Sequence, residues 1–366
     1  MEECVKRLAD WARGRPQGPL SIELQPTNLC NLNCVMCGTR AHYRTIMREN
    51  PGFDPSRDRE SEMPDQRLLE IVDESHARGA KRWLLTGGGE PLFRKAITMS
   101  MVRRIKALGM RGNMNTNAVL LGKDDIRDLV KTEWDILMVS VDSGEPPVHD
   151  RIRNVPGTFD KMSANLMRLR AEKEAKGREH PKIVFNSLLS NLNYNKIDKL
   201  IDFAQRAGCG DITLIPLIEF EGIEADLQLN EAQRKEFQGL IPGFIGLADK
   251  RGIKTNLHTL EDKGAPAAHP DAKARERPSG FAAIPCFEPY LNMVITMDGY
   301  ASPCCMLGSR ESLRDNRLDD IWMGPYFTEI RRKLERGELP SECSRCFFPQ
   351  EVRNRELQRM LAEEPL

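Results

Sequence analysis

The 366-residue chain has no apolar run near the ~20 residues that span a bilayer, and its first residues lack the charged start and apolar core of a secretory signal. It also has no excess of one charge, because 54 lysines and arginines balance 54 acidic residues. A chain without a net field gives no reason to expect a nucleic acid or an anionic membrane as partner. We therefore expect a cytoplasmic protein that binds neither.

Cysteine is too scarce for a disulfide scaffold, since the chain has only ten. Most of them fall into two groups, one near each end of the chain, which indicates metal ligands kept as thiolates in a reducing compartment. Cys4 and Cys209 stand alone, and we expect both to have structural roles. The chain is long enough for a barrel-sized domain and a smaller one.

The first cysteine group is a triplet. Cys30, Cys34 and Cys37 form a C-x3-C-x2-C pattern, and three thiolates at this spacing suit three corners of a four-iron cluster. The fourth iron then has no protein ligand, and an open coordination site is where a metal centre does chemistry. A zinc site is the alternative, although structural zinc prefers paired C-x2-C knuckles with four ligands.

A glycine-rich turn follows the apolar run 83–85. In the segment Thr86-Gly-Gly-Gly-Glu-Pro91, permissive backbone stands at the end of a predicted strand and a carboxylate projects from the turn. Such a turn can lie against a ligand and bind its ammonium group. The sequence thus predicts a metal site at the triplet and a ligand-binding turn after the next strand.

In this order the two motifs resemble the defining motifs of radical S-adenosylmethionine (SAM) enzymes. The resemblance implies that the open iron of a [4Fe-4S] cluster chelates SAM, that Gly88, Gly89 and Glu90 contact it, and that Glu90 meets its amino group. An electron from a flavodoxin- or ferredoxin-type donor then cleaves SAM to methionine and a 5'-deoxyadenosyl radical. Met36 stands where the family usually has an aromatic residue, and its thioether can still pack on adenine.

Short β-rich runs alternate with amphipathic helical segments. This alternation specifies a parallel sheet, and six such units suit the open, partial (β/α)6 TIM-like barrel of the radical SAM family rather than a closed eight-unit barrel. The predicted strands cover residues 20–24, 82–86, 111–115, 136–141, 182–188 and 211–217.

Active sites of such barrels lie at the C-terminal edge of the strands, which is where Asn115, Ser140 and Asp142 fall. The resemblance matches these three to polar positions around SAM, and Arg153 to an arginine near the SAM carboxylate. The alternatives are structural. Asn115 and Asp142 then satisfy backbone groups in turns, and Arg153 is a solvated surface charge.

The second cysteine group comprises Cys286, Cys304, Cys305, Cys343 and Cys346. A predicted hairpin over 293–301 brings Cys286 and Cys304 together. A predicted helix over 318–336 then leads to the final C-x2-C pair, Cys343 and Cys346. Four converging cysteines suit either a Cys4 zinc site or a Cys4 iron–sulfur cluster.

Residues 286–346 resemble the twitch domain, the shortened form of the SPASM domain appended to many radical SAM enzymes. The shared pattern is a first cysteine, Gly-x4-Cys from Gly299, and a distant C-x2-C. The resemblance implies one auxiliary [4Fe-4S] cluster ligated by Cys286, Cys304, Cys343 and Cys346. Cys305 is left over. Its open roles are an alternative ligand, a hydrogen-atom donor and a packing residue, of which we favour packing.

These features divide the chain into five segments. They are an N-terminal helix (1–19), the radical SAM barrel (20–230), a connecting helix and linker (231–280), a small α+β auxiliary-cluster domain (281–350) and a C-terminal helix (351–366).

We expect the enzyme to abstract hydrogen from a small polar substrate such as a sugar, an aminocyclitol or another natural-product intermediate. Oxidation ranks first because the auxiliary cluster can accept an electron, and epimerisation follows if a cysteine returns hydrogen. The spacing Cys286-x17-Cys304 followed by C-x2-C resembles the single-cluster alcohol dehydrogenase of aminoglycoside biosynthesis. About twenty residues precede the first strand, which leaves no room there for a leader-peptide recognition domain.

Glu219, Glu221 and Glu224 follow the sixth predicted strand as candidate bases or substrate ligands, with a solvated loop as the alternative. The long stretch 40–62 is a candidate lid over the substrate or an exposed loop. Two other functions stay open: a radical SAM maturase of peptides or proteins, and a metal-binding module without turnover.

Overall fold

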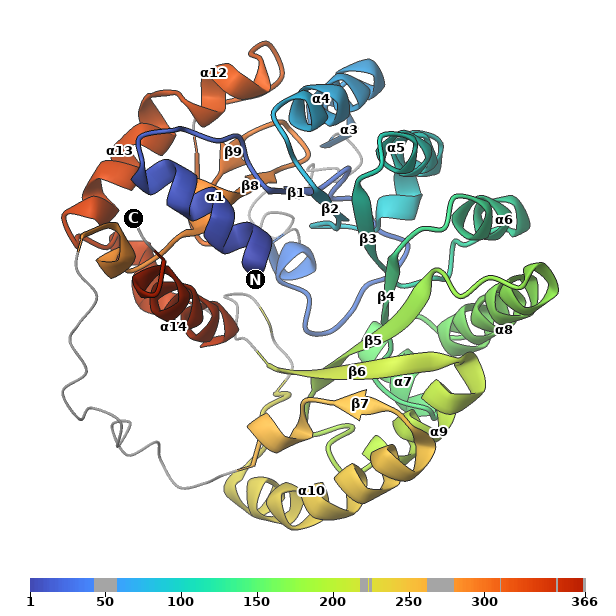
Figure 1. Cartoon of the computed structure of the whole chain (residues 1–366). Coiled ribbons are helices and arrows are strands. Elements are labelled where there is room, and N and C mark those ends of the chain that lie inside the picture. The colour runs from blue at the N-terminus through green and yellow to red at the C-terminus, as the bar shows by residue number, and fades with distance from the viewer. Residues whose placement is uncertain are drawn as a thin grey trace.

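The computed structural model describes residues 1–42, 58–217, 223, 226–261, 280–309, 311–346 and 348–364. Its strands form one sheet in the order β7-β6-β5-β4-β3-β2-β1-β8-β9. Every neighbouring pair is parallel except β8 and β9, which are antiparallel. The sheet curves into an open barrel with the helices that connect its strands on the outside (Figure 1).

The strands are β1 (Ser21–Leu24), β2 (Arg82–Leu85), β3 (Arg111–Thr116), β4 (Ile136–Ser140), β5 (Lys182–Leu189), β6 (Cys209–Pro216), β7 (Lys254–Thr255), β8 (Asn292–Ile295) and β9 (Ala301–Ser302). The helices are α1 (Glu2–Ala12), α3 (Asp58–Ser61), α4 (Asp65–Ala77), α5 (Lys95–Ala107), α6 (Lys123–Lys131), α7 (Pro146–Arg153), α8 (Thr158–Lys176), α9 (Ile197–Ala207), α10 (Glu231–Arg251), α11 (Glu288–Leu291), α12 (Leu318–Trp322), α13 (Pro325–Glu335) and α14 (Phe348–Ala362). Short 3-10 turns are η2 (Pro91–Arg94), η3 (Leu257–Thr259), η4 (Gly280–Ala283) and η5 (Ser341–Arg345).

All six predicted barrel strands are present within two residues of their expected bounds. The alternation of strands and helices that predicted a partial barrel is therefore confirmed. Cys209 is the first residue of β6 and is buried at the N-terminal edge of the sheet, away from the carboxyl ends of the strands. Cys4 is buried on α1, so both isolated cysteines pack as expected.

The two faces of the sheet differ in burial. Side chains alternate along each strand, and on β1 and β2 every second residue is buried while its neighbours are half-exposed. The buried side packs against the surrounding helices, as Trp83 does where its indole nitrogen donates to Ser75 Oγ at 3.2 Å. We call the other side, which carries Glu23, Leu84 and Asn115, the inner face. Its partial exposure leaves room inside the barrel.

The C-terminal part of the chain continues the barrel sheet. Strand β8 pairs in parallel with β1, so that Ser21 lies opposite Asn292 and Leu24 opposite Ile295. Strand β9 then closes the predicted hairpin, with Gly299 in the left-handed region at φ +94°. The two cysteine groups therefore flank one continuous sheet, in which β1 lies between the barrel strands and the hairpin.

A buried arginine holds this C-terminal part together. The Arg331 guanidinium lies 4.7 Å from the ring centre of Trp11 and 4.5 Å from that of Trp322, and it donates to the carbonyl oxygens of Pro289 and Trp322. These partners belong to α1, α11 and α12. Burial lowers the pKa of Arg331 to about 10.

The predicted helix over 318–336 is wrong as a single element, because the structure has α12 and α13 with a break between them. Pro325 has no backbone N–H and disfavours helical backbone at Gly324, so the first helix ends and a second begins. The terminal helix α14 is confirmed and has 15 residues. Residues 262–279, most of the predicted linker, lie outside the described residues.

Candidate active site

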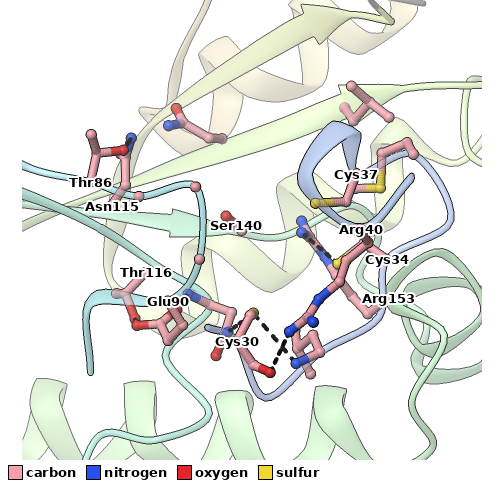
Figure 2. Close-up of a pocket in the computed structure, with 18 of the residues that line it drawn as sticks. Cys30, Cys34, Cys37, Arg40, Thr86, Glu90, Asn115, Thr116, Ser140 and Arg153 are labelled. Carbon is pink, nitrogen blue, oxygen red and sulfur yellow. Dashed lines mark hydrogen bonds between the residues drawn. The ribbon is translucent and has the colours of Figure 1, made fainter. Parts of the chain in front are cut away.

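A cavity of about 350 Å³ opens at the carboxyl ends of the barrel strands (Figure 2). The three cysteines of the triplet lie on the loop after β1, and Thr86 and Asn115 lie on the other side in this view. All predicted cluster and SAM residues of the barrel line this one cavity: Cys30, Cys34, Met36, Cys37, Gly88, Gly89, Glu90, Asn115, Ser140, Asp142 and Arg153.

The glycine turn packs directly on the triplet loop. The Gly89 amide donates to Thr27 O at 3.1 Å, and the Glu90 amide donates to Leu29 O at 2.8 Å. A Cβ on Gly88 would lie 2.1 Å from Asn28 Oδ1, and one on Gly89 would lie 2.1 Å from Leu29 O. Gly89 therefore requires glycine because a side chain there would meet backbone, whereas a side chain at Gly88 would require the Asn28 side chain to move.

Glu90 joins the glycine turn to the end of β3. It is 3% exposed, and its carboxylate accepts hydrogen bonds from Thr116 Oγ1 at 2.6 Å, the Asn117 amide at 2.7 Å and the Leu92 amide at 3.2 Å. Burial raises the pKa of Glu90, while these donors oppose the shift. Three of about four acceptor positions of the carboxylate are thus occupied within the chain.

Arg153 and Asp142 form a buried ion pair beside the triplet. Arg153 Nη2 lies 2.8 Å from Asp142 Oδ2, and Arg153 Nη1 lies 3.7 Å from Cys34 Sγ. The other Asp142 oxygen accepts from the Leu188 amide at 3.0 Å. Arg153 is only 7% exposed, which excludes the solvated surface charge considered for it. Asp142 does satisfy a backbone group, as its structural alternative expected, and it also holds Arg153 against the cysteine.

Hydrogen-bond donors surround Cys30. Its Sγ accepts from the Leu32 amide at 3.4 Å and lies 3.9 Å from Asn117 Nδ2, while Arg40 Nη2 donates to Cys30 O at 2.6 Å. Burial raises the pKa of Cys30 to about 11. Asn117 lies just past β3, so its place at a strand end was the signal that could have found it. Arg40 is the first residue of the stretch 40–62, the candidate lid.

The second cysteine group lines a separate cavity of about 160 Å³ on the inner face beside β1 and β8. All five of its cysteines line this cavity: Cys286, Cys304, Cys305, Cys343 and Cys346. Apolar side chains such as Ile330 and Leu334 complete the wall, and burial raises the pKa of Cys286 to about 12. Cys305 is exposed, whereas the four predicted ligands are partly buried.

The donor sets fit clusters better than single ions. A zinc site needs its donors about 2.3 Å from one point. Within the part of the chain that the structure describes, no three Cys, His, Asp or Glu side chains approach closely enough to hold one metal ion. Cysteines spread around a cavity, with N–H groups directed at their sulfur atoms, suit the separate corners of an iron–sulfur cluster.

Some predicted site residues cannot be placed. Glu219, Glu221 and Glu224 lie outside the described residues, and so do residues 43–57 of the candidate lid. Among the described residues, no helix is both long and apolar enough to cross a membrane.

Comparisons with known proteins agree with this geometry. The family model for the radical SAM superfamily matches residues 24–207, and that for the SPASM iron–sulfur cluster-binding domain matches residues 286–347. An AdoMet-dependent heme synthase of Methanosarcina barkeri is 28% identical over 339 residues, 90% of this chain and 89% of the relative. The mycofactocin maturase MftC of Mycolicibacterium smegmatis is 22% identical, over 93% of this chain and 79% of the relative.

Among solved structures, Streptococcus suis SuiB bound to S-adenosylmethionine superposes with a TM-score of 0.63 at 17% identity, covering 89% of this chain and 71% of SuiB. This likeness shows the fold. The two family matches give the cofactors, which are SAM with a [4Fe-4S] cluster for the barrel and auxiliary iron–sulfur binding for the C-terminal part. The chain belongs to the radical SAM superfamily and carries a SPASM-type iron–sulfur domain.

Proposed function

We propose that this enzyme oxidises a small polar substrate, such as a sugar, an aminocyclitol or another natural-product intermediate. When bound, SAM and its cluster supply a 5'-deoxyadenosyl radical that removes a hydrogen atom, and the auxiliary cluster supplies an electron acceptor. The two cavities of the chain are assigned to these two groups: the cavity with the triplet to SAM, and the cavity with Cys286 to the auxiliary cluster.

The observation that carries the proposal is that both cavities are lined by residues on the inner face of the sheet. Glu23 on β1 lines the second cavity, and its register partner on β2 is Leu84. Two residues beyond Leu84, Thr86 lines the first cavity. Adjacent strands are about 5 Å apart and two residues span about 7 Å, so a small molecule on this half-exposed face reaches toward both cavities.

The residues of the first cavity position the reaction. The Arg153–Asp142 pair forms the wall beside Cys34, and the hydrogen bond from Thr116 to Glu90 holds the turn beside Cys30. Asn115 donates to Thr86 Oγ1 at 3.0 Å, and its own Oδ1 is buried without a partner in the described residues. That acceptor is available to a hydroxyl or amino group in the cavity.

A near full-length likeness supports a small-molecule substrate. The heme synthase of M. barkeri is matched over about nine tenths of both chains, and its name gives a small-molecule product. The second candidate function is peptide maturation, which the mycofactocin maturase favours by its name. Epimerisation is a variant of the first proposal in which Cys305, exposed at the second cavity, returns a hydrogen atom.

The test begins with anaerobically reconstituted protein, for which we expect about eight irons per chain. Formation of 5'-deoxyadenosine with a reduced flavodoxin is then measured with sugars, aminocyclitols and peptides, each against a substrate-free sample. We expect stimulation by a small polar compound and a product two hydrogens lighter. Stimulation by peptides alone would reject the proposal. Zinc in place of iron, with no response to SAM, would leave a binding module without turnover.

Epimerisation has its own signature. A product that has the mass of the substrate in H2O and gains one deuterium in D2O would indicate epimerisation in place of oxidation. Under that outcome, Cys305→Ala should divert the reaction while 5'-deoxyadenosine continues to form, because Cys305 lies outside the first cavity.

A further inference from the structure

Glu23 brings a barrel carboxylate into the auxiliary cavity. It is the third residue of β1, the strand whose following loop carries the triplet, and its side chain lies on the inner face. There it lines the second cavity together with Cys304 and Cys305. No motif marks this residue, and the parallel pairing of Glu23 with Val294 on β8 is what places it there.

Among the described residues, no hydrogen bond or ion pair compensates the Glu23 carboxylate. The charged group that acts on it is another carboxylate, Glu288, and burial and Glu288 together raise the pKa of Glu23. Glu288 itself is compensated, because it lies 2.9 Å from Arg353 Nη1 and accepts from Gln350. The cavity therefore contains one paired and one unpaired carboxylate.

An unpaired, partly buried carboxylate is an unfavourable element of a fold. Glutamine would fill the same space without a charge. Packing alone therefore gives no reason for Glu23, whereas a negative charge beside a redox centre has a direct effect. Reduction adds an electron to a cluster, and a nearby anion opposes that addition, most strongly where water does not screen it.

We propose that Glu23 lowers the reduction potential of the auxiliary cluster and so couples the barrel to the redox chemistry of the C-terminal domain. The inference rests on the second cavity as the cluster site, and its catalytic meaning rests on the proposed oxidation. A lower potential makes the reduced cluster a stronger donor, which favours passing the electron onward to an external one-electron acceptor before the next turnover.

The test is an electron paramagnetic resonance redox titration at pH 8.5, several units above the ordinary pKa of a glutamate carboxyl. It uses full-length reconstituted protein, both with all cysteines and with Cys30, Cys34 and Cys37 replaced by alanine so that the auxiliary cluster titrates alone. We compare wild type with Glu23→Gln and Glu23→Asp. Glu172→Gln, on α8 and outside both cavities, is the matched control.

We expect Glu23→Gln to shift the auxiliary potential upward, Glu23→Asp to stay near wild type, and Glu172→Gln to leave the potential unchanged. Equal potentials for wild type and Glu23→Gln would overturn the proposal. If Glu23→Gln loses iron, Glu23→Ala is titrated in its place; loss of auxiliary iron from both variants, while Glu23→Asp keeps it, would show that Glu23 is a structural residue, and the proposal would fail. Substrate is absent throughout, so a failed small-molecule assay leaves this result standing.

Discussion

The two cysteine cavities present similar thiols in different electrostatic surroundings, because the Asp142 carboxylate of the first cavity is paired with Arg153 whereas the Glu23 carboxylate of the second has no partner among the described residues. In the first, donors approach the sulfur atoms: Arg153 at Cys34, and Asn117 at Cys30. In the second, apolar side chains and the carboxylates of Glu23 and Glu288 form the wall. Positive groups favour an added electron and negative groups oppose it. Under the proposal for Glu23, the auxiliary cluster is the one that gives up its electron more readily.

The cavities also differ in how the chain assembles them. The barrel cysteines come from one eight-residue segment held by the ends of β2, β3 and α7, whereas the auxiliary cysteines come from separate elements between residues 286 and 346. A local loop is fixed by a few neighbouring contacts. A dispersed set depends on the packing of the whole C-terminal part. Damage to each site should therefore have different consequences.

The largest expected effect is that of Cys34→Ala. It removes a corner of the SAM-binding cluster, so 5'-deoxyadenosine formation should fall to background and iron from about eight to about four per chain. Product assay and iron analysis on the reconstituted variant check this. Cys209→Ala, buried outside both cavities, should keep both clusters. A Cys34→Ala protein that still makes 5'-deoxyadenosine would contradict the assignment of the triplet.

Cys343→Ala should separate the two sites. The variant loses an auxiliary ligand on η5, so substrate conversion should fall to background while SAM cleavage persists. Chromatographic measurement of 5'-deoxyadenosine and product in the same reaction checks the split. Loss of both activities at retained barrel iron would mean that the two sites are not chemically separable.

Arg153→Met should destabilise the barrel site by about 3 kcal/mol, because removing one partner of a buried ion pair leaves Asp142 uncompensated. The free energy of unfolding from denaturant titration measures this. Arg151→Met, an exposed position on the same helix, should change stability by less than about 0.5 kcal/mol. Equal stability of the two variants would show that the pair contributes nothing.

Arg331→Met should lower the free energy of unfolding by about 2 kcal/mol. The loss is smaller than for Arg153→Met because the desolvation of the guanidinium already offsets part of its interaction with its aromatic neighbours. Thermal unfolding should shift downward, while SAM binding at the barrel cavity stays near wild type. Arg332→Met, exposed one residue further along α13, is the control. An Arg331→Met protein as stable as this control would show that the contacts of Arg331 with its aromatic neighbours do not stabilise the fold.

Local patterns predicted much of this structure. The six strands followed from β-rich runs that alternate with amphipathic helical segments, and all eleven predicted cluster and SAM residues of the barrel meet in one cavity because parallel strands end at a common edge. The break before Pro325 was also readable, since Gly-Pro is a local signal. Contacts between distant segments were not readable. Nothing in the sequence near Glu23 indicates β8, and nothing near Arg153 indicates that Cys34 is its neighbour.

The pairing of β1 with β8 has a consequence for how the protein is made. Ser21 and Asn292 are about 270 residues apart, and synthesis at about 5–20 residues per second separates their emergence from the ribosome by tens of seconds. During that interval one edge of β1 has no partner, with the triplet loop directly after it. An exposed strand edge invites pairing with other chains. We therefore expect protection of this edge from aggregation to depend on when the last quarter of the chain arrives.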